Sequence, residues 1–184
     1  PNHDGLTRGL ENLDKHISNL QHYGQTVVVA FNRYATDTDE EIDIIRKHCA
    51  EMGVGFAVNN AFNEGGKGAE ELARLVVQTI EEKPSAALQL AYDDNDSVEA
   101  KIEKVSTKVY GAKNVTFSAE ANKKLKMIYD MGYDKFPVCI AKTQYSFSTD
   151  PKLYGVAKDF TVNVSDIVIN AGAEMLVAIA GKIM

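Results

Sequence analysis

Three stretches of this sequence combine amides, hydroxyls, charges and an aromatic ring directly after an apolar run. They are NRYATDTD after Phe31, NNAFNEGGKG after Val58 and KTQYSF after Ala141. Side chains of these types can stack on a flat ring, bind an anion or hydrogen-bond a polar substrate. Polar loops with exposed aromatic groups more often carry function than packing. The three loops are therefore the candidate site.

The segments before these loops have the character of buried strands. TVVVAF (26–31), GFAVNN (55–60) and PVCIA (137–141) are short and largely apolar, which is typical of strands inside a parallel sheet. Ligands of open parallel sheets bind beyond the carboxyl ends of the strands. We therefore expect the three loops to meet along one edge of a sheet.

Helical periodicity separates these strands. Apolar residues recur at steps of three and four over residues 6–20, 42–52, 72–80, 98–109 and 118–128. Thr38 and Glu41 have the spacing of a capping box that opens the second helix. On the fourth helix, Lys101, Lys104 and Lys108 are expected to face outward. Residues 160–164 alternate as a strand does, the chain ends in an apolar strand, and residues 87–92 are compatible with a further strand.

The alternation of helix and strand in the first half predicts an α/β fold. We expect a Rossmann-like parallel sheet with flanking helices, plus a smaller α+β portion at the C-terminal side. The polar break YDDNDS suggests a boundary. Residues 1–92 would then form a parallel α/β lobe carrying the substrate-stacking loops, and residues 93–184 a helical pair followed by strands.

Composition excludes several classes of protein. A net charge of −6 over 184 residues argues against nucleic-acid binding, and no apolar run approaches the ~20 residues of a membrane span. Cys49 and Cys139 are expected to be buried free thiols, which weakly suggests a reducing compartment. No metal-ligand spacing surrounds His48 or any other histidine, so we expect no metal site.

Several features also have purely structural interpretations. Tyr34 could cover a helix end, and Phe62 could fill a gap between helices. Arg33 could pair with Asp37 or Asp39 on the surface, as Lys142 could with Asp150. The segment NEGGKG fails the P-loop pattern, because Lys67 is followed by glycine instead of serine or threonine.

Two long strings, VVVAFNRYATDTDEEI and KTQYSFSTDPKL, closely resemble formate–tetrahydrofolate ligase, also called formyltetrahydrofolate synthetase. LENLDKHISNL and FTVNVSDIVINAGAEMLVAIAGKIM fit the same family, so the resemblance spans essentially the whole chain. It implies an ATP-dependent ligase that joins formate to tetrahydrofolate. The family first makes formyl phosphate, and the folate amine N10 then attacks the formyl carbon to give 10-formyltetrahydrofolate.

The resemblance also implies roles for individual residues. In the family, the folate rings lie between two aromatic side chains, which match Tyr34 and Phe62 here. The family often has phenylalanine and tryptophan at these positions, so both differ in this chain, and each keeps a flat face. The resemblance implies either further folate contacts or a purely loop-shaping role for Asn32, Arg33, Thr36 and Asp37. Phosphate or formyl-oxygen contacts, again with a structural alternative, fall to Lys142, Thr143 and Gln144.

The implied ligands are tetrahydrofolate, formate and ATP with Mg, in a cytoplasmic enzyme that forms homo-oligomers. The family's P-loop has no counterpart in this sequence, so we expect a fragment from the middle to late part of the ligase that is inactive alone. No catalytic residue is assigned. Two other hypotheses stay open, a nucleotide-binding Rossmann-like module and a structural or oligomerisation domain.

Overall fold

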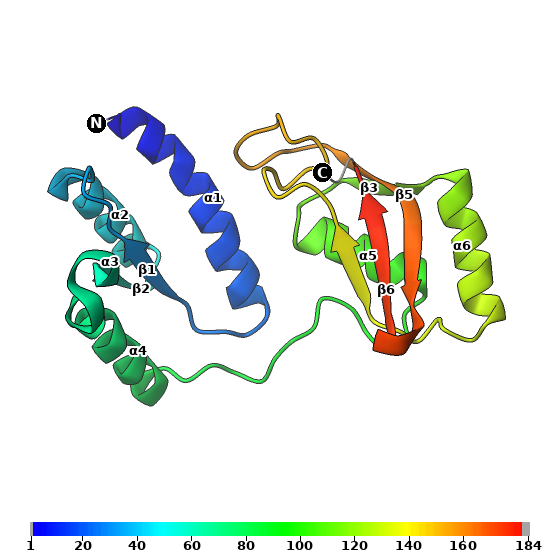
Figure 1. Cartoon of the computed structure of the whole chain (residues 1–184), viewed down its shortest axis with the longest axis horizontal. Helices are drawn as coiled ribbons and strands as arrows, with labels where there is room; N and C mark the ends of the chain where they lie inside the picture. Colours follow the sequence, from blue (N-terminus) through cyan, green and yellow to red (C-terminus); the bar gives the residue numbers. More distant parts are fainter. Residues whose placement is uncertain (1, 182–184) are drawn as a thin grey trace. The chain divides into compact units, whose positions relative to one another are not determined.

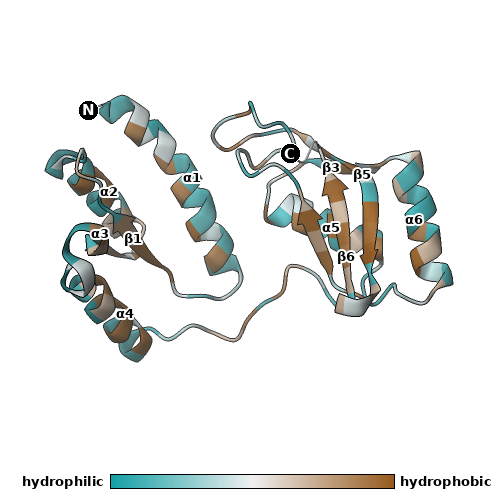
Figure 2. Ribbon diagram, in the orientation of Figure 1, coloured by the Kyte–Doolittle hydropathy of each residue, from teal (hydrophilic) through white to brown (hydrophobic). Residues whose placement is uncertain are grey.

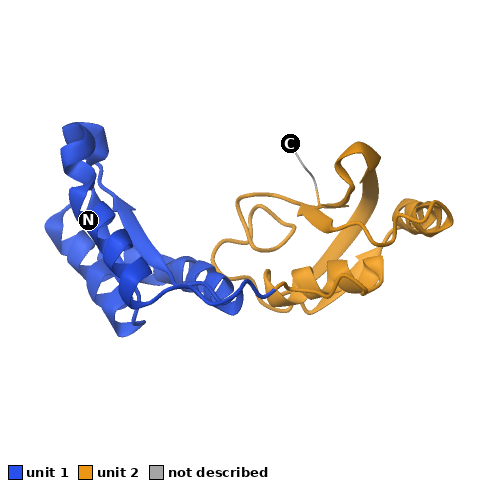
Figure 3. Cartoon of the chain, turned by 90° about the horizontal axis from the view of Figure 1, so that it is seen from below, with its two compact units in different colours: residues 1–89 blue, residues 90–184 orange. Residues whose placement is uncertain are grey.

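The computed structural model describes residues 2–181. The chain divides into two compact units, residues 1–89 and residues 90–184 (Figure 3). Each unit has parallel strands, flanking helices and an apolar core of its own. The predicted α/β fold class is therefore confirmed. Among residues 2–181, no helix combines the length and the apolar character needed to cross a membrane.

Unit 1 alternates helices and strands from its first helix onward (Figure 1). Its elements are α1 (His3–His22), β1 (Val28–Asn32), α2 (Asp39–Glu51), β2 (Gly55–Asn59), α3 (Ala61–Glu64), the 3-10 helix η1 (Gly65–Ala69) and α4 (Glu70–Glu82). β1 and β2 pair in parallel, in a register that sets Val28 opposite Gly55 and Asn32 opposite Asn59. The loops after both strands therefore leave the same edge of the sheet, as predicted.

The core of unit 1 joins α1 and α2 to one face of this strand pair. Its buried side chains are Leu10, Ile17, Val27, Ile45, Cys49 and Val54. Phe31 of β1 and Phe56 of β2 pack against the same core, with ring centroids 6.3 Å apart. This apolar contact fixes the strand pair against the helices, so that the carboxyl ends of both strands are held in place.

α4 packs on β2 but keeps much of its apolar side open. The Leu75 side chain lies 3.4 Å from the position that a Cβ on Gly55 would occupy. No residue of α4 is fully buried, and Val76, Val77 and Ile80 are exposed. Figure 2 shows this apolar side in brown. Within the described part of unit 1, nothing covers it.

Unit 2 is built on a four-stranded mixed sheet. Its elements are α5 (Val98–Lys108), β3 (Asn114–Phe117), α6 (Ala119–Asp130), β4 (Val138–Ala141), β5 (Thr161–Asn170), the 3-10 helix η2 (Ala171–Ala173) and β6 (Met175–Ala180). The strand order is β3-β5-β6-β4. β5 and β6 are antiparallel, while β3 and β4 pair in parallel with their neighbours. α5 and α6 contribute to one shared core on this sheet.

Residues 87–92, considered as a further strand, do not form one. At the start of this segment, the backbone N–H of Gln89 donates to Tyr23 (3.0 Å), and that of the preceding Ala86 donates to Gly24 (2.9 Å), both within unit 1. Leu88 is exposed. An apolar run alone is insufficient, because a strand needs a hydrogen-bonded partner for its backbone. Conversely, the strand β3 was not predicted, because its four residues are too few to show a period.

Cys139, predicted to be buried, is exposed, whereas Cys49 is buried as predicted. Cys139 lies on β4, at an edge of the four-stranded sheet. Its strand neighbours Val138 and Ile140 pack against the core. Because side chains alternate between the two faces of a strand, Cys139 must point to the face opposite that core.

Lys101, predicted to face outward from α5, is instead fully buried. Its ammonium group donates to the backbone carbonyls of Asp134 (3.1 Å) and Phe136 (3.2 Å) and lies 5.9 Å from the Tyr92 ring centroid. Burial lowers the pKa of Lys101. The prediction is confirmed for Lys108, which is exposed and donates to the Ala91 carbonyl, and in part for Lys104, which is half-buried and donates to Asp96.

Replacing Lys101 with methionine should lower the free energy of unfolding by about 1–3 kcal/mol, because two buried carbonyls lose their donor. Urea unfolding followed by circular dichroism measures this change. Lys126→Met, at an exposed position of α6, is the matched control and should stay within about 0.5 kcal/mol of the parent. Equal effects of the two substitutions would contradict the role assigned to Lys101.

Candidate functional site

The two loops of unit 1 begin from side-by-side positions at the ends of β1 and β2. The side-chain amide of Asn59 donates to the side-chain oxygen of Asn32 (2.9 Å), and the backbone N–H of Arg33 donates to the carbonyl of Asn59 (3.0 Å). These bonds continue the strand pairing one step past the ladder. Asn32, predicted to contact a ligand, is thereby engaged in holding the two loops together.

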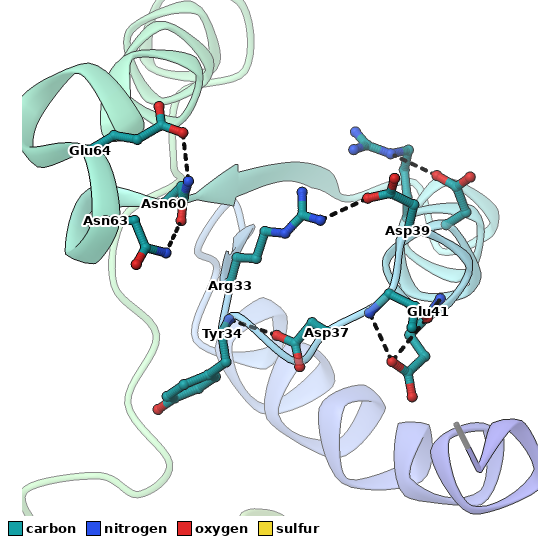
Figure 4. A network of polar contacts seen from close by, with 11 residues as sticks. Arg33, Tyr34, Asp37, Asp39, Glu41, Asn60, Asn63 and Glu64 are labelled. Carbon is teal, nitrogen blue, oxygen red and sulfur yellow. Dashed lines mark hydrogen bonds and ion pairs between the residues drawn. The ribbon is translucent and has the colours of Figure 1, made fainter.

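Tyr34 is displayed by a short turn that Asp37 closes (Figure 4). The Asp37 carboxylate accepts from the backbone N–H of Tyr34 (2.8 Å), and the N–H of Asp37 donates back to the Tyr34 carbonyl (3.1 Å). With the backbone fixed in this way, the Tyr34 ring projects from the turn and is 71% exposed. It does not cover a helix end, which was the structural alternative.

The capping box at the start of α2 anchors the far side of this turn. The Glu41 carboxylate accepts from the backbone N–H and the hydroxyl of Thr38 (both 3.1 Å), and the hydroxyl accepts from the Glu41 N–H (3.3 Å). These bonds, the backbone one first, lower the pKa of Glu41. Thr36, between the two anchors, is exposed, so its hydroxyl can reach a ligand.

Arg33 forms an ion pair with Asp39 at 2.9 Å, and its side chain points away from Tyr34 (Figure 4). The alternative of a surface pair, with Asp39 as partner, is therefore observed. Exposed pairs of this kind contribute about 0–1 kcal/mol. The cost of redirecting the guanidinium to an anionic ligand is correspondingly small.

Phe62 lies on the second loop, in the four-residue helix α3, and is 96% exposed. Three asparagine contacts surround it, one to the backbone and two between side chains. The side-chain oxygen of Asn59 accepts from the Ala61 N–H (3.2 Å), and the Asn60 side chain bonds Glu64 and Asn63, both at 2.7 Å. Phe62 fills no gap between helices, and its ring has no packing partner to fix it.

The first two loops therefore present one open aromatic ring each from the same sheet edge. Tyr34 follows β1 by two residues, and Phe62 follows β2 by three. Large apolar rings at such exposure are unfavourable in water unless another surface covers them. Each ring offers an open face on which a flat, partly apolar group can stack.

The third loop, predicted to share this edge, leaves a different sheet. It follows β4, which belongs to unit 2, whereas β1 and β2 form the sheet of unit 1. The prediction of one common edge was wrong because a parallel βαβ pattern does not tell how many sheets the strands form. The loop is therefore a feature of unit 2 by itself.

Lys142 organises the third loop from inside. Its ammonium group donates to the carbonyls of Thr143 (3.1 Å), Ser146 and Ser148 (3.3 Å), and lies 4.7 Å from the Tyr110 ring centroid. Burial lowers the pKa of Lys142. An ammonium has three N–H groups, and all three have protein acceptors here, so the suggested pairing with Asp150 is absent.

The other two predicted residues of this loop differ in accessibility. Thr143 is buried, and its hydroxyl accepts from the backbone N–H of Tyr145 (3.3 Å). Gln144 and Tyr145 are exposed. Lys142 and Thr143 therefore shape the loop, and Gln144 is the predicted residue that is open to a ligand.

Asn59 and Asn60 were missed as site residues. Their signal was available, since asparagine bonds nearby backbone and stabilises turns, and here two asparagines stand at the end of a strand, Asn59 as its last residue and Asn60 directly after it. Among residues 2–181, no group of three or more His, Cys, Asp or Glu side chains could hold a metal ion.

Removing the Asp37 carboxylate should loosen the turn that carries Tyr34. In Asp37→Ala we expect amide hydrogen exchange at Tyr34 to accelerate about fivefold, the equivalent of one ordinary hydrogen bond. Asp37→Asn keeps an acceptor oxygen and should change the rate by less than about twofold. Nuclear magnetic resonance resolves the two. Unchanged exchange in Asp37→Ala would contradict the proposed closure.

Acid should destabilise unit 1 partly through Glu41. Its pKa is depressed in the folded state, so its stabilising effect is complete above the unfolded value of about 4.3 and is lost as the pH falls through and below that value. Urea midpoints from about pH 6 to about pH 3 should therefore fall less steeply in Glu41→Gln than in the parent. The neighbouring Glu40→Gln is the control, and its profile should follow the parent.

Comparison with known proteins identifies the family. A family model described as Formate--tetrahydrofolate ligase matches residues 1–184. Curated relatives of the same name are 65% identical in Phocaeicola vulgatus, 61% in Bacteroides fragilis and 49% in Campylobacter concisus, over 100% of this chain and 33% of each relative. The chain thus spans about a third of the length of the curated relatives that it matches. It belongs to the formate–tetrahydrofolate ligase family.

Proposed function

We propose that this chain contributes the folate-binding part of an ATP-dependent ligase that joins formate to tetrahydrofolate through formyl phosphate. The observation that carries the proposal is the pair of open rings, Tyr34 and Phe62, on adjacent loops of one sheet edge. The folate would insert its flat ring system between them. Membership of the ligase family supplies the substrate class.

Stacking is the physical basis of this binding. A ring that stacks on an aromatic face typically gains about 1–3 kcal/mol. Tyr34 and Phe62 are 71% and 96% exposed, so a ligand between them would also remove most of their apolar surface from water, at roughly 25 cal/mol per Å². The loops need no rearrangement to expose the rings, which reduces the cost of ordering on binding.

The polar residues around the rings divide into two groups. Asn32 and Asp37 hold the loop backbone, so their contribution to folate binding is mainly the shape of the loop. Thr36 and Arg33 are the residues free to contact the folate. Arg33 would exchange Asp39 for a substrate carboxylate, since a guanidinium binds carboxylates in the same forked geometry.

The chemical step needs residues beyond these. Phosphoryl transfer from ATP with Mg depends on groups that position and neutralise the phosphates, and residues 1–184 contain no P-loop string. We therefore expect the chain alone to be inactive. The catalytic groups would lie in the two thirds of the ligase that this chain does not match in its relatives. Gln144 remains a candidate for phosphate or formyl-oxygen contact, while Lys142 and Thr143 support its loop. The ligase would act in the cytoplasm as a homo-oligomer.

Calorimetric titration with tetrahydrofolate tests the proposal. Tyr34→Ala and Phe62→Ala should each raise the Kd about 5- to 150-fold, the equivalent of one stacking contact. Tyr154→Ala removes an equally open ring from unit 2 and should leave the Kd unchanged.

The same three substitutions in a ligase polypeptide that contains this segment give a kinetic counterpart. The KM for tetrahydrofolate should rise in the first two variants and stay constant in the third. A folded protein in which neither Tyr34→Ala nor Phe62→Ala weakens folate binding would disprove the stacking site.

A further inference from the structure

We infer that Gly68 is a positioning residue for folate binding, because its missing side chain lets η1 lie against the backbone that carries Phe62. The inference rests on the proposed function, since it assigns Phe62 its role as a stacking ring. In this inference, Gly68 makes no contact with the folate but determines the position of the Phe62 ring.

The approach at Gly68 is closer than any side chain permits. A Cβ on this residue would lie 2.4 Å from the carbonyl oxygen of Asn60, 2.5 Å from its carbonyl carbon and 2.9 Å from the backbone nitrogen of Ala61. All three atoms belong to the backbone, so no side-chain rotation can relieve the clash. Ordinary contact begins at 3.4 Å, so the two segments would have to separate by about 1 Å.

The same two segments are joined by a hydrogen bond. The backbone N–H of Asn60 donates to the carbonyl of Gly68 (2.9 Å). Residues 60–68 therefore form a closed loop whose two ends touch, with α3 and η1 between them. Gly65, at φ +59, makes the reversal between the two helices, a conformation that favours glycine.

Phe62 depends on this closure for its position. The ring is 96% exposed, so no neighbouring side chain holds it, and its location follows from the backbone of Ala61 and Phe62 alone. The atoms that a Cβ on Gly68 would displace are those that immediately precede Phe62 in the chain. A shift of about 1 Å at a binding ring is large, because misplacements of this size can cost up to ~100-fold in rate.

Gly66→Ala is a matched control within the same 3-10 helix. A Cβ on Gly66 would meet nothing within 4 Å. Both substitutions add one methyl group to η1 and reduce the flexibility of the unfolded chain equally. Only the one at Gly68 disturbs the contact with Asn60, so a difference between the two variants reports that contact.

The test is a double-mutant cycle in a ligase polypeptide that contains this segment. We expect Gly68→Ala to raise the KM for tetrahydrofolate about 5-fold or more, and by no more than Phe62→Ala does, with the KM for ATP unchanged, and Gly66→Ala to change neither. In a Phe62→Ala background, Gly68→Ala should have no further effect on the KM for tetrahydrofolate, because the ring through which it acts is gone.

Each contrary result has one meaning. The inference is overturned if Gly68→Ala raises the KM for tetrahydrofolate equally in the presence and in the absence of Phe62. It is also overturned if Gly68→Ala leaves this KM unchanged while Phe62→Ala clearly raises it. Both results leave the proposed function intact. No effect of Phe62→Ala itself overturns the proposed function, and the inference with it. If Gly68→Ala fails to fold, an amide-to-ester replacement at Asn60 takes its place, since this change removes the backbone N–H that donates to the Gly68 carbonyl. An unchanged KM for tetrahydrofolate in this folded variant would then overturn the inference.

Discussion

The parallel pairing of β1 and β2 is the constraint on which the candidate site depends. Because Asn32 stands opposite Asn59 in the register, both strands end at the same level and their loops start side by side. A slip of one residue would turn every side chain of one strand to the other face. It would also separate the Asn32 and Asn59 side chains, whose hydrogen bond closes the end of the pair. The proposed folate site, which needs both aromatic rings, depends on this register.

Beyond the strand ends, hydrogen bonds from short polar side chains replace the backbone hydrogen bonds of the strand pair. Asp37 satisfies the backbone of the Tyr34 turn, Asn59 does the same at the start of α3, and the Asn60 side chain links the side chains of Asn63 and Glu64. Neither Tyr34 nor Phe62 takes part in this bonding through its side chain. The polar network therefore fixes the backbone, and the rings are left free for a ligand. Polar side chains that fix the loop backbone in this way hold the exposed apolar rings in place without burying them.

Unit 2 fixes its loops by a different device, the capture of backbone carbonyls by a lysine. Lys101 binds two carbonyls between α6 and β4, and Lys142 binds three within the loop after β4. Both ammonium groups lie near a tyrosine ring and both have a pKa lowered by burial. A buried charge is tolerated here because carbonyl oxygens replace its water. These lysines are therefore part of the architecture of the unit.

The sequence by itself determined five helices (α1, α2, α4, α5 and α6), five strands (β1, β2, β4, β5 and β6), the capping box at Thr38 and the adjacency of the first two loops, because these follow from local periodicity and from hydrogen bonds between near neighbours. It missed α3 and β3, which are too short to show a period, and it suggested a strand at residues 87–92 that does not form. Its long strings also determined the family. Only the tertiary structure decided that β4 belongs to a second sheet, that Lys101 is buried and that Gly68 touches Asn60. Each of these depends on which distant segments meet, and the amphipathic period of a helix or strand carries no information about its partner. From sequence alone, Lys101 is expected to face solvent, and only the fold brings two backbone carbonyls close to its ammonium group. Gly68 is likewise expected to be a flexible residue, and only the fold places another backbone where its Cβ would be.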